Sequence, residues 1–168
     1  WQAVHTAASP SARVSAAGAL VPSSLADSDS YYLFGGERNG YAFNDLWRYD
    51  LTSETFTFVS VSNASPPGRY DHAAIATSDG RLVIIGGRDA SGTALKDIWA
   101  FDPLAKSWSE VGEIVSPAFG LAAAAVGNDV YVLGGKESGG LSSRFQKCSP
   151  HAGGYACEDI TGGCPLEL

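Results

Sequence analysis

The sequence predicts an all-β protein built from about three repeats of a four-stranded antiparallel sheet. Short strand-like runs bounded by turn residues recur along the chain, and helical periodicity is nearly absent. An apolar run ends in a glycine pair three times, and successive pairs lie 51 and 48 residues apart: Gly35/Gly36, Gly86/Gly87 and Gly134/Gly135. A period near 50 residues indicates repeated small sheets that bury their faces against one another.

Composition and charge limit the range of possible functions. Of the 168 residues, 45% are hydrophobic and 17% charged, as in a folded domain. The net charge of −7 gives no electrostatic footprint for nucleic acid and no attraction to an anionic membrane surface. No apolar run reaches the roughly 18 residues of a spanning helix. The absence of methionine indicates a processed or excised piece of a longer protein.

The first two strands of each repeat follow from the apolar pattern. The runs before the glycine pairs are apolar on both sides, which predicts strands buried on both faces. Turn residues precede them, as at Asp79–Gly80 and Asn128–Asp129. Innermost strands are therefore expected near residues 14–20, 71–77 and 119–126. The run Leu121–Val126 is helix-prone by composition, but it aligns with the strand at Ala73, so a strand is predicted.

A tryptophan motif marks the third strand. Residues 45–50 and 97–102 share the pattern Asp-aliphatic-Trp-x-aromatic-Asp, and residues 143–148 occupy that place in degraded form, with Phe145 in the tryptophan position. A further aromatic follows nine residues after each tryptophan, and Tyr155 follows Phe145 by ten. These aromatics predict a fourth, outermost strand.

The repeat pattern also divides the chain into structural units. Residues 1–10 share Trp, Val, Ser and Pro with residues 108–117 at equal spacing. Trp1–Val4 is therefore predicted to be the outermost strand of a preceding or shared four-stranded sheet. The expected units are that strand (1–9), two complete repeats (10–61 and 62–113), a degenerate repeat (114–160) and a cysteine-containing tail (161–168).

The glycine pairs and tryptophan motifs together resemble the kelch family. The resemblance covers the chain to about Ile160, and it implies that each repeat is one blade of a β-propeller. Propellers use typically four to eight blades, so about three blades form an incomplete ring. The other blades are expected from the same or another chain.

The resemblance also indicates two groups of candidate binding residues. The kelch pattern often has an Arg and a His at the start of the innermost strand, here Arg13, Arg69 and His72. They either brace loops by hydrogen bonds or contact a ligand at the channel mouth, and Pro117 aligns with Arg69 in the third repeat. The loops after the glycine pairs share one face with these positions, and that face commonly binds peptides. The predicted partner-binding residues are Arg38, Asn39, Arg88, Asp89, Lys136 and Glu137.

Catalysis by this chain is not expected. Galactose oxidase has a kelch-type propeller with a copper site, but His5, His72 and His151 are scattered here and no pair has ligand spacing. No nucleophile elbow, phosphate loop or paired-carboxylate motif occurs. We therefore expect no cofactor and no metal. The predicted function is a scaffold that binds a partner protein. The alternatives are an extracellular adhesion or carbohydrate-binding module and, less favoured, a non-catalytic part of a galactose-oxidase-like enzyme.

The cysteines and a glycosylation sequon give information about the cellular location of the protein. Cys148, Cys157 and Cys164 lie near the end of the chain. Either Cys148 bridges Cys157 across the last hairpin, or all three are free thiols. Residues 63–65 form a glycosylation sequon at Asn63, although Pro66 follows directly. These features slightly favour an extracellular or cell-surface location over a cytoplasmic one.

Overall fold

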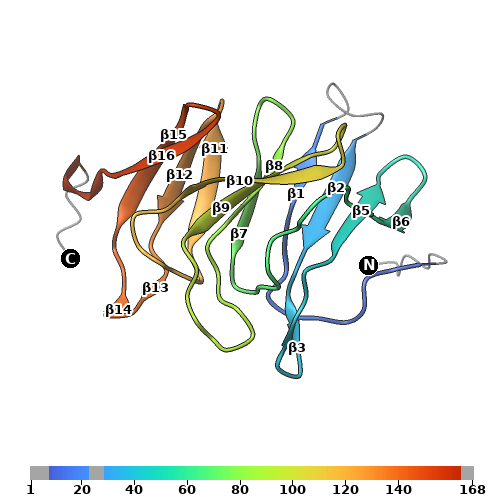
Figure 1. Ribbon diagram of the computed structural model, residues 1–168, viewed down its shortest axis with the longest axis horizontal. Helices are drawn as coiled ribbons and strands as arrows, with labels where there is room; N and C mark the ends of the chain where they lie inside the picture. The colour runs from blue at the N-terminus through green and yellow to red at the C-terminus, as the bar shows by residue number, and fades with distance from the viewer. Residues whose placement is uncertain (1–7, 23–28, 164–168) are drawn as a thin grey trace.

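A computed structural model of the chain describes residues 8–22 and 29–163 (Figure 1). Three antiparallel sheets of four strands, here called blades 1 to 3, follow one another along the chain. Blade 1 contains β1 (Ala17–Val21), β2 (Ser30–Phe34), β5 (Leu46–Asp50) and β6 (Thr55–Phe58). Blade 2 contains β7 (Ala73–Ala76), β8 (Leu82–Ile85), β9 (Asp97–Asp102) and β10 (Ser107–Glu113). Blade 3 contains β11 (Ala122–Val126), β12 (Asp129–Leu133), β15 (Phe145–His151) and β16 (Gly154–Asp159).

Smaller elements connect these strands. Two-stranded hairpins follow the glycine pairs of blades 1 and 3: β3 (Glu37–Arg38) with β4 (Tyr41–Ala42), and β13 (Lys136–Glu137) with β14 (Gly140–Leu141). A short 3-10 turn, η2, spans Thr161–Gly163. The predicted all-β class and the four-stranded antiparallel blades are confirmed, and the alanine-rich run forms strand β11. Trp1–Val4 lies outside the described residues.

Adjacent blades bury their facing surfaces against each other. One apolar cluster joins blades 1 and 2 and a second joins blades 2 and 3. Trp108, which is 1% exposed, anchors the first cluster, with ring centroids 5.2 Å from those of both Phe34 and Phe101. Burial on both faces explains why the β8 run is apolar throughout.

The glycine pairs are the joints between blades. The amide of Gly36 donates to the carbonyl of Arg69 at 2.8 Å, and that of Gly87 donates to Ala118 at 2.9 Å, so the second glycine binds the next blade. Both glycines have positive φ, +98° and +94°, and an added Cβ would meet atoms of neighbouring residues at 2.9 Å and 2.7 Å. Glycine alone fits this conformation and this close approach.

The far face of blade 3 is open. Phe34 and Ile85 precede their glycine pairs and are fully buried by the following blade, whereas the equivalent Leu133 is 47% exposed. Within the described residues, the amide of Gly135 makes no hydrogen bond of the kind that Gly36 and Gly87 make. The ring is therefore not closed in this structure, as the sequence predicts.

The register of the third repeat differs from the predicted alignment by one residue. Phe145 lies opposite Leu133, as Leu46 lies opposite Phe34 and Ile98 opposite Ile85. The tryptophan position of the third repeat is therefore held by Gln146, not by Phe145. Gln146 is 2% exposed and accepts a hydrogen bond from the amide of Val115 at 2.8 Å. Counted from Gln146, Tyr155 follows at the same nine-residue interval as in the other repeats.

A disulfide joins the last two strands. Cys148 on β15 pairs directly with Cys157 on β16, and their sulfur atoms are bonded. Cys148 is fully buried against blade 2, so the bridge ties the outermost strand to the core. Cys164 lies outside the described residues.

Candidate functional site

One end of the blades gathers two sets of loops. The lead-in loops (8–16, 62–72 and 114–121) precede the innermost strands, and the post-doublet loops (37–44, 88–96 and 136–143) follow the glycine pairs. A β-bridge joins the two loops in each blade: Val14 to Glu37, Tyr70 to Arg88, and Phe119 to Lys136. Both sets therefore lie at the same end, at the bottom of Figure 1. We call this end the rim.

Arg13 and Arg69 are internal braces of the rim. Arg69 is fully buried, and its guanidinium binds both carboxylate oxygens of Asp97 at 2.7 Å and 2.6 Å and the carbonyl of Gly86 at 3.0 Å. The indole of Trp99 donates to the same carboxylate at 2.6 Å. Arg13 makes the equivalent pair with Asp45 at 2.5 Å and 2.9 Å.

These contacts fix the charge of the aspartates. Burial raises the pKa of Asp97, but the hydrogen bond and positive charge of Arg69 outweigh it and leave the pKa below its usual value. The same balance lowers the pKa of Asp45 beside Arg13. The repeated Asp and Trp of the third strand thus hold the arginine in place.

The third repeat replaces the whole unit. The bridges place Ala118, not Pro117, at the position of Arg69, and Ala118 is 2% exposed. Arg144 occupies the position of Asp97, since its carbonyl accepts the amide of the first glycine of the pair. Its guanidinium pairs instead with Glu137 at 3.2 Å and with Asp159. The charge at the start of the third strand is therefore reversed.

His72 is buried at the inner edge of the rim. Its ring lies edge-on to Phe34, with centroids 5.8 Å apart, and neither ring nitrogen has a hydrogen-bond partner among the described residues. Burial, helped by the charge of Arg69, lowers the pKa of His72 to about 3, so the ring is neutral at physiological pH. Arg13, Arg69 and His72 thus face the protein interior.

The six predicted partner-binding residues divide into two groups. Arg38, Asn39 and Lys136 are exposed at the tips or bases of the rim hairpins. Arg88 is partly buried: it pairs with Asp71 at 2.7 Å and stacks on the rings of Tyr70 and Phe119, with its guanidinium carbon 4.6 Å and 4.5 Å from their centroids. Arg88 therefore clamps blades 2 and 3 together.

Asp89 and Glu137 are also used internally. Asp89 accepts hydrogen bonds from the amides of Ser91 and Thr93 at 2.8 Å and 3.0 Å, which shapes the post-doublet loop of blade 2. A hydrogen bond from the Ser142 hydroxyl, with a further one from Arg144, lowers the pKa of Glu137. Both carboxylates therefore accept hydrogen bonds from within the rim.

The rim also carries exposed apolar side chains that were not among the predicted partner-binding residues. Tyr41 is 61% exposed and Leu141 is 93% exposed, on the hairpins of blades 1 and 3. Between blades 2 and 3 lies a recess of about 340 Å³, lined by Gly92, Thr93, Ala94, Pro117, Phe119, Glu137 and Ser138. These loops are rich in glycine and charged residues, so their composition indicates charged contacts and not apolar ones.

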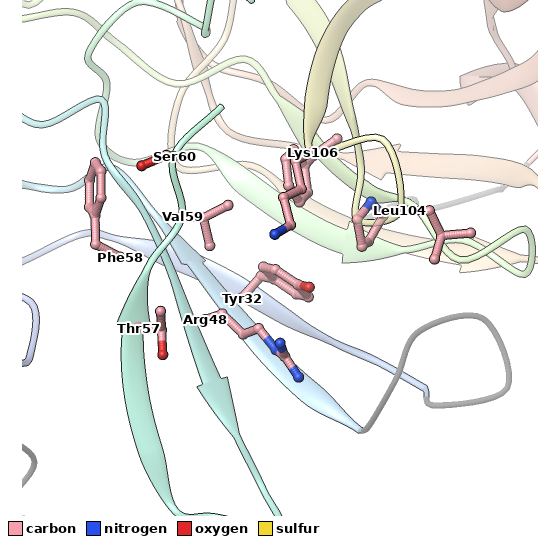
Figure 2. A pocket seen from close by; sticks show the side chains of 10 residues that line it. Tyr32, Arg48, Thr57, Phe58, Val59, Ser60, Leu104 and Lys106 are labelled. Carbon is pink, nitrogen blue, oxygen red and sulfur yellow. The ribbon is translucent and has the colours of Figure 1, made fainter. Parts of the chain in front are cut away.

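A second hollow lies at the opposite end, between blades 1 and 2. It measures about 310 Å³, and its walls include Tyr32 and Phe101, whose rings are 5.7 Å apart. The hairpin between β9 and β10 contributes Leu104 and Lys106, and Figure 2 shows the Lys106 side chain reaching toward Tyr32. Leu104 is 74% exposed, so this end also has an apolar residue in solvent.

Two kinds of feature are missing from the described residues. No group of three or more His, Cys, Asp or Glu side chains there could hold a metal ion. That part of the chain also has no helix long and apolar enough to cross a membrane.

The blades and their glycine joints define the chain as a segment of a repeat propeller. Residues 1–143 match the KLHDC2/KLHL20/DRC7 Kelch-repeats domain. The chain belongs to the kelch-repeat family.

Similar proteins are long, and their names differ. Human multiple epidermal growth factor-like domains protein 8 is 37% identical over 167 residues, which cover 91% of this chain and 6% of that protein. The Chlamydomonas reinhardtii flagellar outer arm dynein alpha chain is 36% identical over 64% of this chain and 3% of its own length. Arabidopsis thaliana acyl-CoA-binding domain-containing protein 5 is 29% identical over 65% of this chain and 17% of its own length. The chain spans only a small part of each relative.

Proposed function

We propose that this chain binds a partner protein through the rim, as part of a larger kelch propeller. The observation that carries the proposal is the exposed apolar surface at this end. Leu141 and Tyr41 are exposed on the hairpins of blades 3 and 1, and a recess lined in part by Phe119 lies between blades 2 and 3. A side chain of the partner fits such a recess, and aromatic or aliphatic anchors contribute most of the energy of many interfaces.

Exposed positive charges on the rim add specificity. Arg38 and Lys136 are exposed on the hairpins of blades 1 and 3, while the protein as a whole carries a net charge of −7. Two exposed cations on an acidic protein favour a partner surface that places a carboxylate beside its apolar anchor. The braces at Arg13 and Arg69 hold the rim loops rigid, which lowers the entropy cost of binding.

An oxidising compartment suits the chain. The Cys148–Cys157 disulfide persists in secreted and cell-surface proteins and is rare in the cytosol. One relative is named for its epidermal growth factor-like domains, a disulfide-dense class of extracellular module. We therefore propose that the module works outside the cell, a setting that the alternative adhesion or carbohydrate-binding function shares.

A matched pair of photo-crosslinking variants tests the proposal. A photoreactive residue replaces Leu141 on the rim in one protein and Leu104 at the opposite end in the other, since both are exposed leucines on hairpins. On cells that display the partner, the variant with the photoreactive residue at position 141 should give a discrete protein adduct. The variant with that residue at position 104 should give none. Adducts at Leu104 alone would refute rim binding. Adducts to glycan alone, from either position, would favour the carbohydrate-binding alternative.

A further inference from the structure

The outer edge of blade 2 is closed by a side chain. An outermost strand presents unpaired N–H and C=O groups, and in β10 those of Trp108 face the segment that arrives from blade 1. There the Asn63 amide donates from Nδ2 to the Trp108 carbonyl at 2.6 Å, and the Trp108 amide donates to Asn63 Oδ1 at 3.0 Å. The backbone amide of Ser62 donates to the Lys106 carbonyl at 3.0 Å. The side chain of Asn63 thus pairs with β10 as a neighbouring strand would.

The two bonds fix which amide hydrogen is used. Both partners belong to Trp108, so Oδ1 and the donated hydrogen must lie on the same side of the planar amide. Reversing the amide would set a donor against the Trp108 N–H, so the hydrogen bonds define its orientation. The hydrogen cis to Oδ1 is therefore the one that reaches the Trp108 carbonyl.

The same hydrogen is the one that an N-linked sugar replaces. Transfer of a glycan forms a bond from Nδ2 to the anomeric carbon, breaks the bond of that carbon to the diphosphate of a lipid-linked donor, and releases one amide proton. The product is a secondary amide, and its trans form places the sugar cis to Oδ1. That position already holds the hydrogen bond to Trp108.

We propose that glycosylation of Asn63 and the closed junction between blades 1 and 2 exclude each other. Asn63 acts as an edge clip, and the folded protein carries it unmodified although residues 63–65 form a sequon. A sugar added before blade 2 folds would leave the Trp108 backbone unpaired. Trp108 anchors the core of this junction, so the junction would open locally.

Hydrogen exchange of β10 measures the clip directly. The protein is produced in a secretory host as wild type, Ser65→Ala and Asn63→Ala, and the exchange of the Trp108 amide is followed together with intact mass. Ser65→Ala removes the sequon and leaves the clip, so it is the matched control. Trp108 should exchange at equal rates in the unglycosylated wild type and Ser65→Ala, and at least about tenfold faster in Asn63→Ala.

The outcomes separate clearly. Folded wild type without sugar on Asn63, or a glycosylated fraction in which Trp108 exchanges as fast as in Asn63→Ala, supports the proposal. A glycosylated fraction whose Trp108 amide stays as slow as in Ser65→Ala overturns it, as does unchanged exchange in Asn63→Ala. If Asn63→Ala does not fold, Asn63→Asp replaces it. That variant keeps the acceptor and sets a carboxylate oxygen against the Trp108 carbonyl, and an unchanged melting temperature would overturn the clip.

Discussion

Arg69 holds the lead-in loop of blade 2 against the third strand of that blade. It is fully buried, and it makes a bidentate pair with Asp97 and a hydrogen bond to a glycine carbonyl. Asp97→Asn should lower the free energy of unfolding by about 3 kcal/mol, because the guanidinium stays buried without a countercharge. Chemical denaturation measures the change, and Glu110→Gln on an exposed position of β10 is the control. A loss below about 1 kcal/mol would show that the pair does not brace the rim.

His72 gives the stability a pH dependence. Its pKa is about 3 in the fold and about 6.5 in the unfolded chain, so between these values the unfolded chain binds one more proton. Stability should therefore fall as pH drops from 6.5 toward 3, by up to about 1.4 kcal/mol per pH unit. His72→Leu should flatten the profile between pH 6.5 and 5, since Leu121 holds the equivalent place in blade 3. An unchanged slope in this variant, with exposed His151→Gln as the control, would assign the proton to another group.

Arg88 and Arg38 follow equivalent glycine pairs but differ in environment. Arg88 has an ion pair and two aromatic faces, so Arg88→Ala should cost about 1 to 2 kcal/mol. Arg38 is exposed, and Arg38→Ala should change stability by less than about 0.5 kcal/mol. Thermal unfolding of the two single variants tests this contrast. Equal effects would mean that the clamp contributes nothing measurable.

At the scale of elements, the disulfide sets the stability of blade 3. The bridge closes a short loop across β15 and β16, and a reduced chain should lose about 2 to 3 kcal/mol through loop entropy. The loss should be local, with faster hydrogen exchange in β15 and β16 than in β7 and β8. Comparison of wild type with the double variant Cys148→Val/Cys157→Ala measures it. Uniformly faster exchange in all three blades would contradict a local role.

The strands could be predicted from the sequence because the glycine pairs recur in phase. Each pair marks both the end of a buried strand and a joint with the next blade, so its backbone conformation and its position repeat together. The register of the third repeat could not be predicted in this way. Gln146 replaces the aromatic that would have fixed it, and Phe145 beside it offered a false match.

The candidate site was less predictable, because exposure depends on contacts between loops. The sequence shows a charged residue after each glycine pair, but not that Arg88 stacks on Phe119 of the next blade. It likewise shows a sequon at Asn63, but not the pairing with Trp108, which lies 45 residues away. The apolar side chains at Leu141 and Tyr41 are single residues without a pattern.

At the scale of the whole molecule, the open face of blade 3 predicts a further blade. Leu133 and Ile85 hold equivalent positions, but only Ile85 is covered. In this chain Ile85→Ala should cost about 2 to 4 kcal/mol and Leu133→Ala less than about 1 kcal/mol. In a longer protein that contains the next repeat, Leu133→Ala should become as costly as Ile85→Ala. Chemical denaturation of this chain and of the longer protein, each with and without the substitutions, tests this. If Leu133→Ala still costs little in the longer protein, the next blade does not cover this face.

The affinity for the partner tests rim binding most directly. Leu141→Asp and Leu104→Asp place the same charge on two exposed hairpin leucines at opposite ends of the blades. The free energy of unfolding of both variants should lie within about 0.5 kcal/mol of the wild-type value. The binding is measured by titration calorimetry with the partner that the crosslinking experiment identifies. Leu141→Asp should weaken binding by at least about tenfold, or 1.4 kcal/mol, and Leu104→Asp should leave the affinity unchanged. Equal affinity of wild type and Leu141→Asp, or a loss confined to Leu104→Asp, would contradict binding at the rim.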